Sequence, residues 1–80
     1  MAARLPGIGK RSLTIAGHRT SISLEPEFWE ALNRLAQARG LSAQGLVAEI
    51  DRERDGGNLS SAIRVHLLAA ALNGALPEAR

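Results

Sequence analysis

The sequence predicts a mostly α-helical chain with one short β ribbon. Residues 19–24 alternate polar and apolar side chains, which is the pattern of a half-buried strand. Three later segments place apolar residues at the spacing of a helix, and glycines separate these segments from one another. At 80 residues the chain forms one domain at most. A chain this short buries a small fraction of its surface, so association with a second copy is a common remedy.

The predicted strand has one apolar and one polar face, because successive side chains of an extended chain point to opposite sides. The apolar face holds Thr20, Ile22 and Leu24, and the polar face holds Arg19, Ser21 and Ser23. A single strand leaves its backbone N–H and C=O groups without partners, so this segment requires a second strand.

The sequence leaves three arrangements open for this strand. The same strand of a second copy can pair with it around a two-fold axis, which makes an antiparallel ribbon. Alternatively, the strand pairs with residues 12–15 of its own chain in a hairpin. Residues 12–15 also alternate, and residues 16–19 contain a glycine and have a length compatible with a hairpin loop. In the third arrangement the two segments form one extended arm that bends at Gly17. A ribbon that presents an arginine and short hydroxyls suits the major groove of DNA, where arginine pairs with guanine in bidentate fashion.

The first helix is predicted from Pro26 to about Arg39. Proline fits the first turn of a helix, and the flanking Glu25 and Glu27 suit the positive end of the helix dipole. Gly40 is a natural C-terminal stop. One face of this helix carries the apolar residues Phe28, Trp29, Leu32, Leu35 and Ala36. We interpret the two aromatic residues as core anchors beneath the ribbon.

Two further helices follow. Ser42 caps the second helix, whose buried stripe is Leu46, Val47 and Ile50, and which ends in the charged run 51–55. The third helix runs from Leu59 to about Leu72, and Asn58 or Ser60 caps it. This helix is apolar on most sides, so it requires burial against the first two helices or across a subunit interface.

The charge of the chain is unevenly distributed. Residues 1–24 carry four basic residues and no acid, whereas residues 25–80 carry six arginines and eight acids. A basic end that also carries the predicted strand favours a polyanionic partner. We assign residues 1–10 to a flexible basic arm, residues 11–72 to the folded domain with its third helix, and residues 73–80 to a frayed tail.

The chain lacks the residues that several classes of function require. The chain has no cysteine, and its two histidines have no neighbour at ligand spacing, so we expect no metal and no cofactor. Ser60 and Ser61 share a helix with His66 without facing it, and no carboxylate is placed to orient the imidazole, so we expect no enzyme and no catalytic residue. The sequence shows neither a signal peptide nor a membrane span, which favours a cytoplasmic protein without a membrane partner.

The order of strand, helix, Gly40-Leu41-Ser42 turn and helix resembles the ribbon-helix-helix superfamily of bacterial DNA-binding proteins. The blocks 13–25, 28–29, 47–51 and 58–65 are similar to short ribbon-helix-helix proteins common in alphaproteobacteria. This resemblance implies a ribbon-helix-helix dimer with an additional C-terminal third helix, whose paired strands enter the major groove. It also implies that Arg19, Ser21 and Ser23 read base edges.

The resemblance further implies a phosphate site at the start of the second helix. Together with the basic and turn residues near the ribbon, the expected phosphate contacts are Lys10, Arg11, His18 and Ser42. The expected dimer core is Ile22, Leu24, Phe28, Trp29, Leu32, Leu46 and Ile50. The segment 58–64 itself resembles the start of a second helix of this fold, and in that alignment the phosphate site lies at Asn58 and Ser60. We favour Ser42 because the spacing from strand to turn is then the short one that the fold expects.

These observations predict a dimeric, sequence-specific DNA-binding protein that regulates transcription. Its expected partners are double-stranded DNA and further copies of itself, as a homodimer or a higher even-numbered oligomer. The alternative is a protein-interaction module, such as an antitoxin that binds a partner protein through the C-terminal helix. The broad apolar face of residues 59–72 motivates this alternative.

Overall fold

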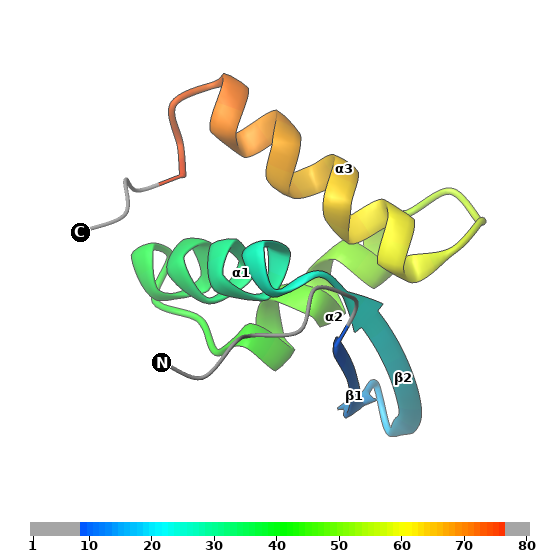
Figure 1. Cartoon of the computed structure of the whole chain (residues 1–80). Helices are drawn as coiled ribbons and strands as arrows, with labels where there is room; N and C mark the ends of the chain where they lie inside the picture. Colours follow the sequence, from blue (N-terminus) through cyan, green and yellow to red (C-terminus); the bar gives the residue numbers. More distant parts are fainter. Residues whose placement is uncertain (1–8, 77–80) are drawn as a thin grey trace, which may run out of the picture.

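Two strands and three helices make up the part of the chain that the computed structural model describes, residues 9–76. In chain order they are β1 (Gly9–Ile15), β2 (His18–Leu24), α1 (Pro26–Ala38), α2 (Ala43–Glu53) and α3 (Leu59–Leu72). The two strands form one antiparallel hairpin, which extends downward beside α2 at the lower right of Figure 1. The predicted class, mostly helical with one short ribbon, is confirmed.

The ribbon is formed within one chain. Strand β1 pairs with β2 so that Ile15 lies opposite His18, and only Ala16 and Gly17 connect the strands. Both connecting residues have positive φ angles, 52° and 83°, as a type I′ hairpin turn requires. Of the three arrangements that the sequence left open, the structure has the intrachain hairpin.

The hairpin begins earlier than the folded domain that we predicted. Gly9 and Lys10 belong to β1, although we assigned them to the arm of residues 1–10. Gly9 is held because the indole Nε1 of Trp29 donates a hydrogen bond to its carbonyl oxygen at 3.0 Å, and Lys10 pairs with Ser23 across the ribbon. The rest of the predicted arm, residues 1–8, and residues 77–80 of the predicted tail lie outside the described residues.

The helices begin and end where their capping residues predict. Helix α1 starts at Pro26, and the left-handed Gly40 (φ 71°) lets the N–H of Leu41 bond to the carbonyl of Ala36 at 2.8 Å. Ser42 Oγ caps α2 by accepting a hydrogen bond from the N–H of Gly45 at 2.9 Å. Asn58, and not Ser60, caps α3: its Oδ1 accepts from the N–H of Ser61 at 3.0 Å.

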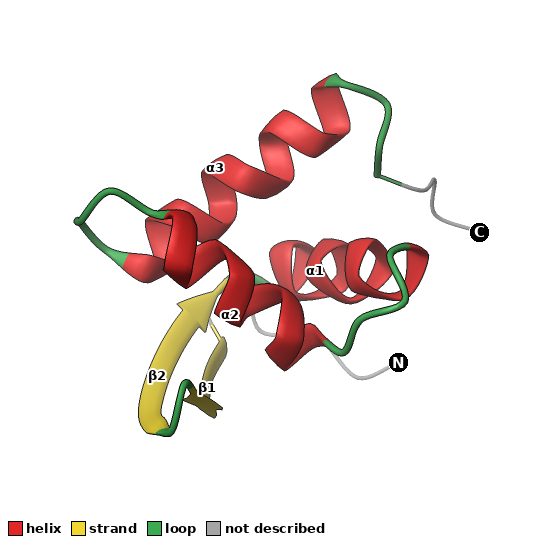
Figure 2. Cartoon of the chain, turned by 180° about the vertical axis from the view of Figure 1, so that it is seen from behind, coloured by secondary structure: helices red, strands yellow, loops and turns green. Residues whose placement is uncertain are grey.

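One apolar core joins all five elements. Each helix packs against the other two, and the back view in Figure 2 shows α3 lying across α1 and α2. Within residues 9–76 no polar side chain is buried. The buried residues are Ile15, Ile22, Leu24, Trp29, Leu32, Leu35, Ala36, Leu46, Val47, Ile50, Ile63, Leu67 and Ala70. Because α3 supplies three of them, it is an integral part of the domain.

Candidate nucleic-acid interface

The hairpin has a wholly polar face. Residues opposite each other in an antiparallel pair share one face of the ribbon. One such face, here called the outer face, consists of three cross-strand pairs: Lys10 with Ser23, Ser12 with Ser21, and Thr14 with Arg19. Five of these six residues are exposed, and Ser23 is half-buried. The outer face therefore presents two cations and four hydroxyls at fixed spacings on a rigid two-stranded support.

The cations of the hairpin are available for an external anion. Within the described residues, the ion pairs are Arg34 with Glu30, Arg39 with Glu49, Arg54 with Asp51, and Arg64 with Glu25. None of them involves Lys10, Arg11 or Arg19. Strands β1 and β2 contain no acid, so the positive potential of the hairpin is not neutralised locally.

Arg11 and His18 lie on the other face of the ribbon, which turns toward the helices. Arg11 is opposite the buried Ile22, and its guanidinium carbon lies 4.5 Å from the ring centroid of Trp29. His18 is opposite Ile15 and is exposed beside the turn. The structure thus separates these two expected phosphate contacts from Lys10 and Arg19. Strand alternation is the signal in the sequence that distinguishes them, since Arg11 has the parity of Leu13 and Ile15.

The starts of two helices flank the ribbon on opposite edges. On the β1 edge, the N–H of Thr14 donates to Oε1 of Gln44, in the first turn of α2, at 3.2 Å. On the β2 edge, the N–H of Ser23 donates to Oγ of Ser60, in the first turn of α3, at 3.1 Å. The positive ends of both helix dipoles therefore lie beside the hairpin.

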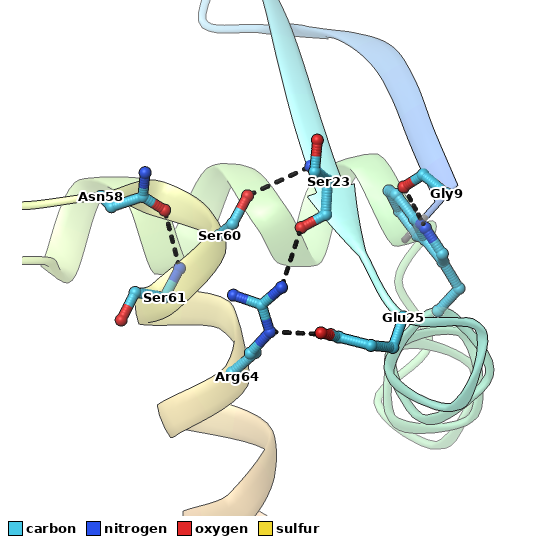
Figure 3. Close-up of polar contacts among 8 residues, drawn as sticks. Gly9, Ser23, Glu25, Asn58, Ser60, Ser61 and Arg64 are labelled. Carbon is cyan, nitrogen blue, oxygen red and sulfur yellow. Dashed lines mark hydrogen bonds and ion pairs between the residues drawn. The ribbon is translucent and has the colours of Figure 1, made fainter. Parts of the chain in front are cut away.

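Arg64 holds α3 against β2 beside the contact between Ser23 and Ser60 (Figure 3). Its guanidinium donates to Oε1 of Glu25 at 2.8 Å and to the carbonyl oxygen of Ser23 at 3.3 Å. The hydrogen bond from Arg64 lowers the pKa of the Glu25 carboxyl below its ordinary value. Helix α3 thus occupies both the N–H and the C=O that Ser23 directs away from β1, at the end of the β2 edge.

Both candidate phosphate positions, Ser42 and Asn58, are exposed capping residues at these helix starts. From the sequence alone, Ser42 and Asn58 were alternative positions for the phosphate site. The structure places the helix starts on different edges of one hairpin, so the two positions do not exclude each other. Ser60 differs from both, because its hydroxyl already accepts the Ser23 N–H.

The residues expected to form a dimer core lie inside a single chain. Six of the seven are buried, with exposed fractions of 5% or less, and Phe28 is half-buried against the same core. The ring of Phe28 lies under Arg64, 5.8 Å from ring centroid to guanidinium carbon. One copy of the chain therefore covers these side chains without a second copy.

Sequence reasoning did not include Ser12 and Thr14 among the site residues, although both lie on the outer face. Their signal was present, since Leu13 and Ile15 alternate with them. It also missed Arg64, which no local signal reveals, because its partners Glu25 and Ser23 lie 39 and 41 residues away in the chain.

Residues 9–76 contain no group of three or more His, Asp or Glu side chains that could hold a metal ion. None of the helices in the same range combines the length and the apolar character that crossing a bilayer requires.

Comparisons with known proteins agree with this architecture. The sequence model of a family described as "Ribbon-helix-helix domain" matches residues 8–71. Among solved structures, an uncharacterized protein from Bordetella pertussis Tohama I is similar over 86% of this chain, with 27% sequence identity and a TM-score of 0.73. The matched region spans 59% of that protein. Among curated proteins, none matches the sequence.

Proposed function

Because the chain belongs to the ribbon-helix-helix domain family, we propose that it is a homodimeric, sequence-specific DNA-binding protein that regulates transcription. In this proposal the hairpin of each chain enters the major groove with its outer face toward the bases. The groove is about 12 Å wide and admits a two-stranded ribbon.

The observation that carries this proposal is the composition of the outer face. It combines Lys10 and Arg19 with four hydroxyls and no acid, on a hairpin whose cations have no ion pair within residues 9–76. An arginine held on a strand can donate two hydrogen bonds to the O6 and N7 of a guanine, while serine and threonine hydroxyls bond to several bases. Arg19 then supplies most of the base discrimination.

The two flanking helix starts support a role in positioning the ribbon. Backbone N–H groups at a helix start bind phosphate oxygens, and phosphate contacts fix the orientation of a protein on the duplex. We assign Ser42 to the strand of DNA beside β1 and Asn58 to the strand beside β2, with Lys10 as the phosphate contact on the ribbon. Arg11 and His18 have a smaller part in this arrangement, because they lie on the face turned toward the helices.

The test is a titration of fluorescent duplexes, selected by binding from a random pool, at several salt concentrations. We expect Arg19→Ala to weaken binding to the selected sequence by about 1–3 kcal/mol and to relax the preference at one base position, since it removes a bidentate contact. Lys10→Ala is expected to weaken binding to all duplexes alike and to reduce the salt slope by about 1.

Arg52→Ala is the matched control, because Arg52 is an exposed cation in the last turn of α2, at the end opposite the helix start. It removes the same charge and should leave both the affinity and the sequence preference close to those of the unsubstituted chain. The absence of duplex binding at low salt would contradict the proposal. Equal losses for Arg52→Ala and Arg19→Ala would show that net charge alone governs binding.

The second candidate function is a protein-interaction module that holds a partner protein through α3. The exposed apolar residues Val65, Leu68 and Leu72 favour it. The same titration separates the two functions, because an interaction module has no need of the outer face of the hairpin and binds no duplex.

A further inference from the structure

Gln44 joins the start of α2 to the half of the hairpin that lies nearest the turn. Its Oε1 accepts a hydrogen bond from the N–H of Thr14 at 3.2 Å. Within residues 9–76, the other hydrogen bonds between side chains and the ribbon backbone are made at Gly9 and Ser23, at the opposite end of the ribbon. The contact with Gln44 is therefore the polar attachment of the half of the ribbon that carries Arg19.

Thr14 and Arg19 form the closest kind of cross-strand pair. They lie opposite each other in the register of the hairpin. Because the Thr14 N–H points away from β2 and toward Gln44, this pair is not one of the hydrogen-bonded pairs of the ladder. In a pair of this kind the two Cα atoms lie about 4.5 Å apart and the side chains are closest. The backbone that Gln44 holds is thus the nearest support of the arginine on the outer face.

We infer that Gln44 is a positioning residue for base readout, which holds the pair of Thr14 and Arg19 at a fixed place relative to the start of α2. Arg19 then reaches its base when the helix start binds phosphate. The inference rests on the proposed function and adds to it a residue that acts through Arg19. The N–H groups of Ala43 and Gln44 are among the donors that a helix start leaves without a partner in the helix. One residue therefore offers its backbone to the phosphate and its side chain to the ribbon.

This hydrogen bond supplies a directional restraint that the apolar contacts of the ribbon lack. Ile15, next to Thr14, is 3% exposed and holds this end of the ribbon against the core. Apolar burial is not directional, whereas a hydrogen bond weakens steeply when its geometry changes. A bidentate contact with guanine needs similar precision, since two donors must meet two acceptors at once. Misplacement of Arg19 therefore costs base discrimination, while the phosphate contacts keep most of the affinity.

Position 44 allows a test in which the acceptor alone is changed. Gln44 is exposed and lies outside the apolar core, so its substitution leaves the packing of α2 in place. Leucine has a helix propensity close to that of glutamine and no acceptor, whereas glutamate keeps an oxygen acceptor and adds a negative charge. The chain has one other glutamine, Gln37, which is exposed in α1 and provides the matched control.

The first test measures the contact in the free chain, by hydrogen exchange of backbone N–H groups observed by NMR. We expect Gln44→Leu to speed the exchange of the Thr14 N–H about 5-fold, which corresponds to the loss of one ordinary hydrogen bond, and Gln44→Glu to keep its protection. The N–H of Ser12, two residues earlier on the same edge of β1, should exchange at one rate in all variants. Unchanged exchange of the Thr14 N–H in Gln44→Leu would overturn the inference.

The second test measures base discrimination, as the ratio of the affinities for the selected duplex and for a duplex changed at the base position that Arg19→Ala relaxes. We expect Gln44→Leu to lower this ratio about 5-fold and Gln37→Leu to leave it unchanged. Gln44→Glu should weaken binding to both duplexes through its charge and keep the ratio, because its carboxylate accepts the same N–H. Circular dichroism would establish that each variant is folded.

A double-mutant cycle separates positioning from direct contact. If Gln44 acts through Arg19, Gln44→Leu has no further effect on the ratio in a chain that already carries Arg19→Ala. Additive losses in the double variant, or a preference lost at a different base position, would show that Gln44 contacts the DNA itself and would refute the positioning role.

The same measurements distinguish this inference from the proposed function. A chain that binds no duplex at low salt refutes both. A chain whose sequence preference depends on Arg19 and is unchanged by Gln44→Leu refutes the positioning role alone. A preference that Gln44→Leu relaxes and Gln44→Glu keeps, together with faster exchange of the Thr14 N–H in Gln44→Leu, supports it.

Discussion

Arg64 shows how one side chain joins segments that are far apart in the sequence. Its guanidinium contacts the Glu25 carboxylate and the Ser23 carbonyl, and it lies over the ring of Phe28. A planar group with five donors can make these contacts at once, whereas a lysine offers a single charged centre. At the scale of the residue, this arginine ties the first turns of α3 to the junction between β2 and α1.

The pair with Glu25 predicts a particular dependence of stability on pH. A carboxyl whose pKa is lowered in the folded chain stabilises the fold above its unfolded pKa and loses that contribution as the pH falls through the folded value. We therefore expect Glu25→Gln to lower the urea midpoint at pH 7. The difference from the unsubstituted chain should begin to shrink as the pH falls through the ordinary glutamate pKa of about 4.3 and vanish only below the lowered pKa of the folded chain. Trp29 fluorescence reports the unfolding.

The control for this prediction is Glu27→Gln in the same helical turn, since Glu27 is exposed and forms no ion pair within residues 9–76. It shares the interaction with the helix dipole and lacks the contact with Arg64. Coincident pH profiles for the two variants would mean that the pair with Arg64 contributes nothing to stability.

The hairpin is the element whose geometry depends most on its turn. Ala16 adopts a left-handed conformation, φ 52°, which costs an L-residue roughly 1–2 kcal/mol, while Gly17 adopts φ 83° without that cost. Nothing lies within 4 Å of a Cβ built on Gly17, so the effects of substitution there are conformational and not steric. The turn therefore sets both the register of the outer face and part of the stability of the ribbon.

We expect Ala16→Asn to raise the free energy of unfolding by about 0.5–1 kcal/mol, because asparagine tolerates the left-handed conformation and Asn-Gly is the preferred type I′ pair. Gly17→Ala should lower it by about 1 kcal/mol for the opposite reason. Urea titration followed by Trp29 fluorescence measures both. Changes of the same sign in the two variants would contradict the type I′ assignment.

At the scale of the whole molecule, α3 converts a small arrangement of ribbon and two helices into a domain with a continuous core. Ile63, Leu67 and Ala70 complete the apolar cluster over α1, α2 and β2. An 80-residue chain buries only a small apolar core, and the free energy of unfolding of a domain is only about 5–15 kcal/mol. Removing one large side chain from this cluster therefore costs a large fraction of the free energy of unfolding.

We expect Leu67→Ala to lower the free energy of unfolding by about 2–5 kcal/mol, since it removes a buried leucine and leaves a cavity. Leu68→Ala on the same helix is the matched control, because Leu68 is more than half exposed, and its effect on the monomer should stay within about 0.5 kcal/mol. Both are measured by urea titration at concentrations that keep the chain monomeric. Equal effects would show that α3 is not anchored by its core side.

The sequence by itself determined the three helices, the N-cap of α2, the glycine that ends α1 and the two faces of β2. These features depend on interactions between residues a few positions apart: the hydroxyl of Ser42 with the N–H of Gly45, the left-handed Gly40, and the alternation that puts Ile22 and Leu24 opposite Ser21 and Ser23. Local interactions of this kind can be predicted from the spacing of residues along the chain.

Only the tertiary structure decided which strand pairs with β2, which cations share the outer face, and which side of α3 is buried. The first two depend on the register that the Ala16-Gly17 turn imposes, and a shift of one residue would exchange Lys10 with Arg11 on that face. The third depends on the choice between two apolar sides of one helix, Ile63 with Leu67 or Val65 with Leu68. Hydrophobicity favours both sides, and packing against α1 and α2, with Arg64 bound to Glu25, selects one.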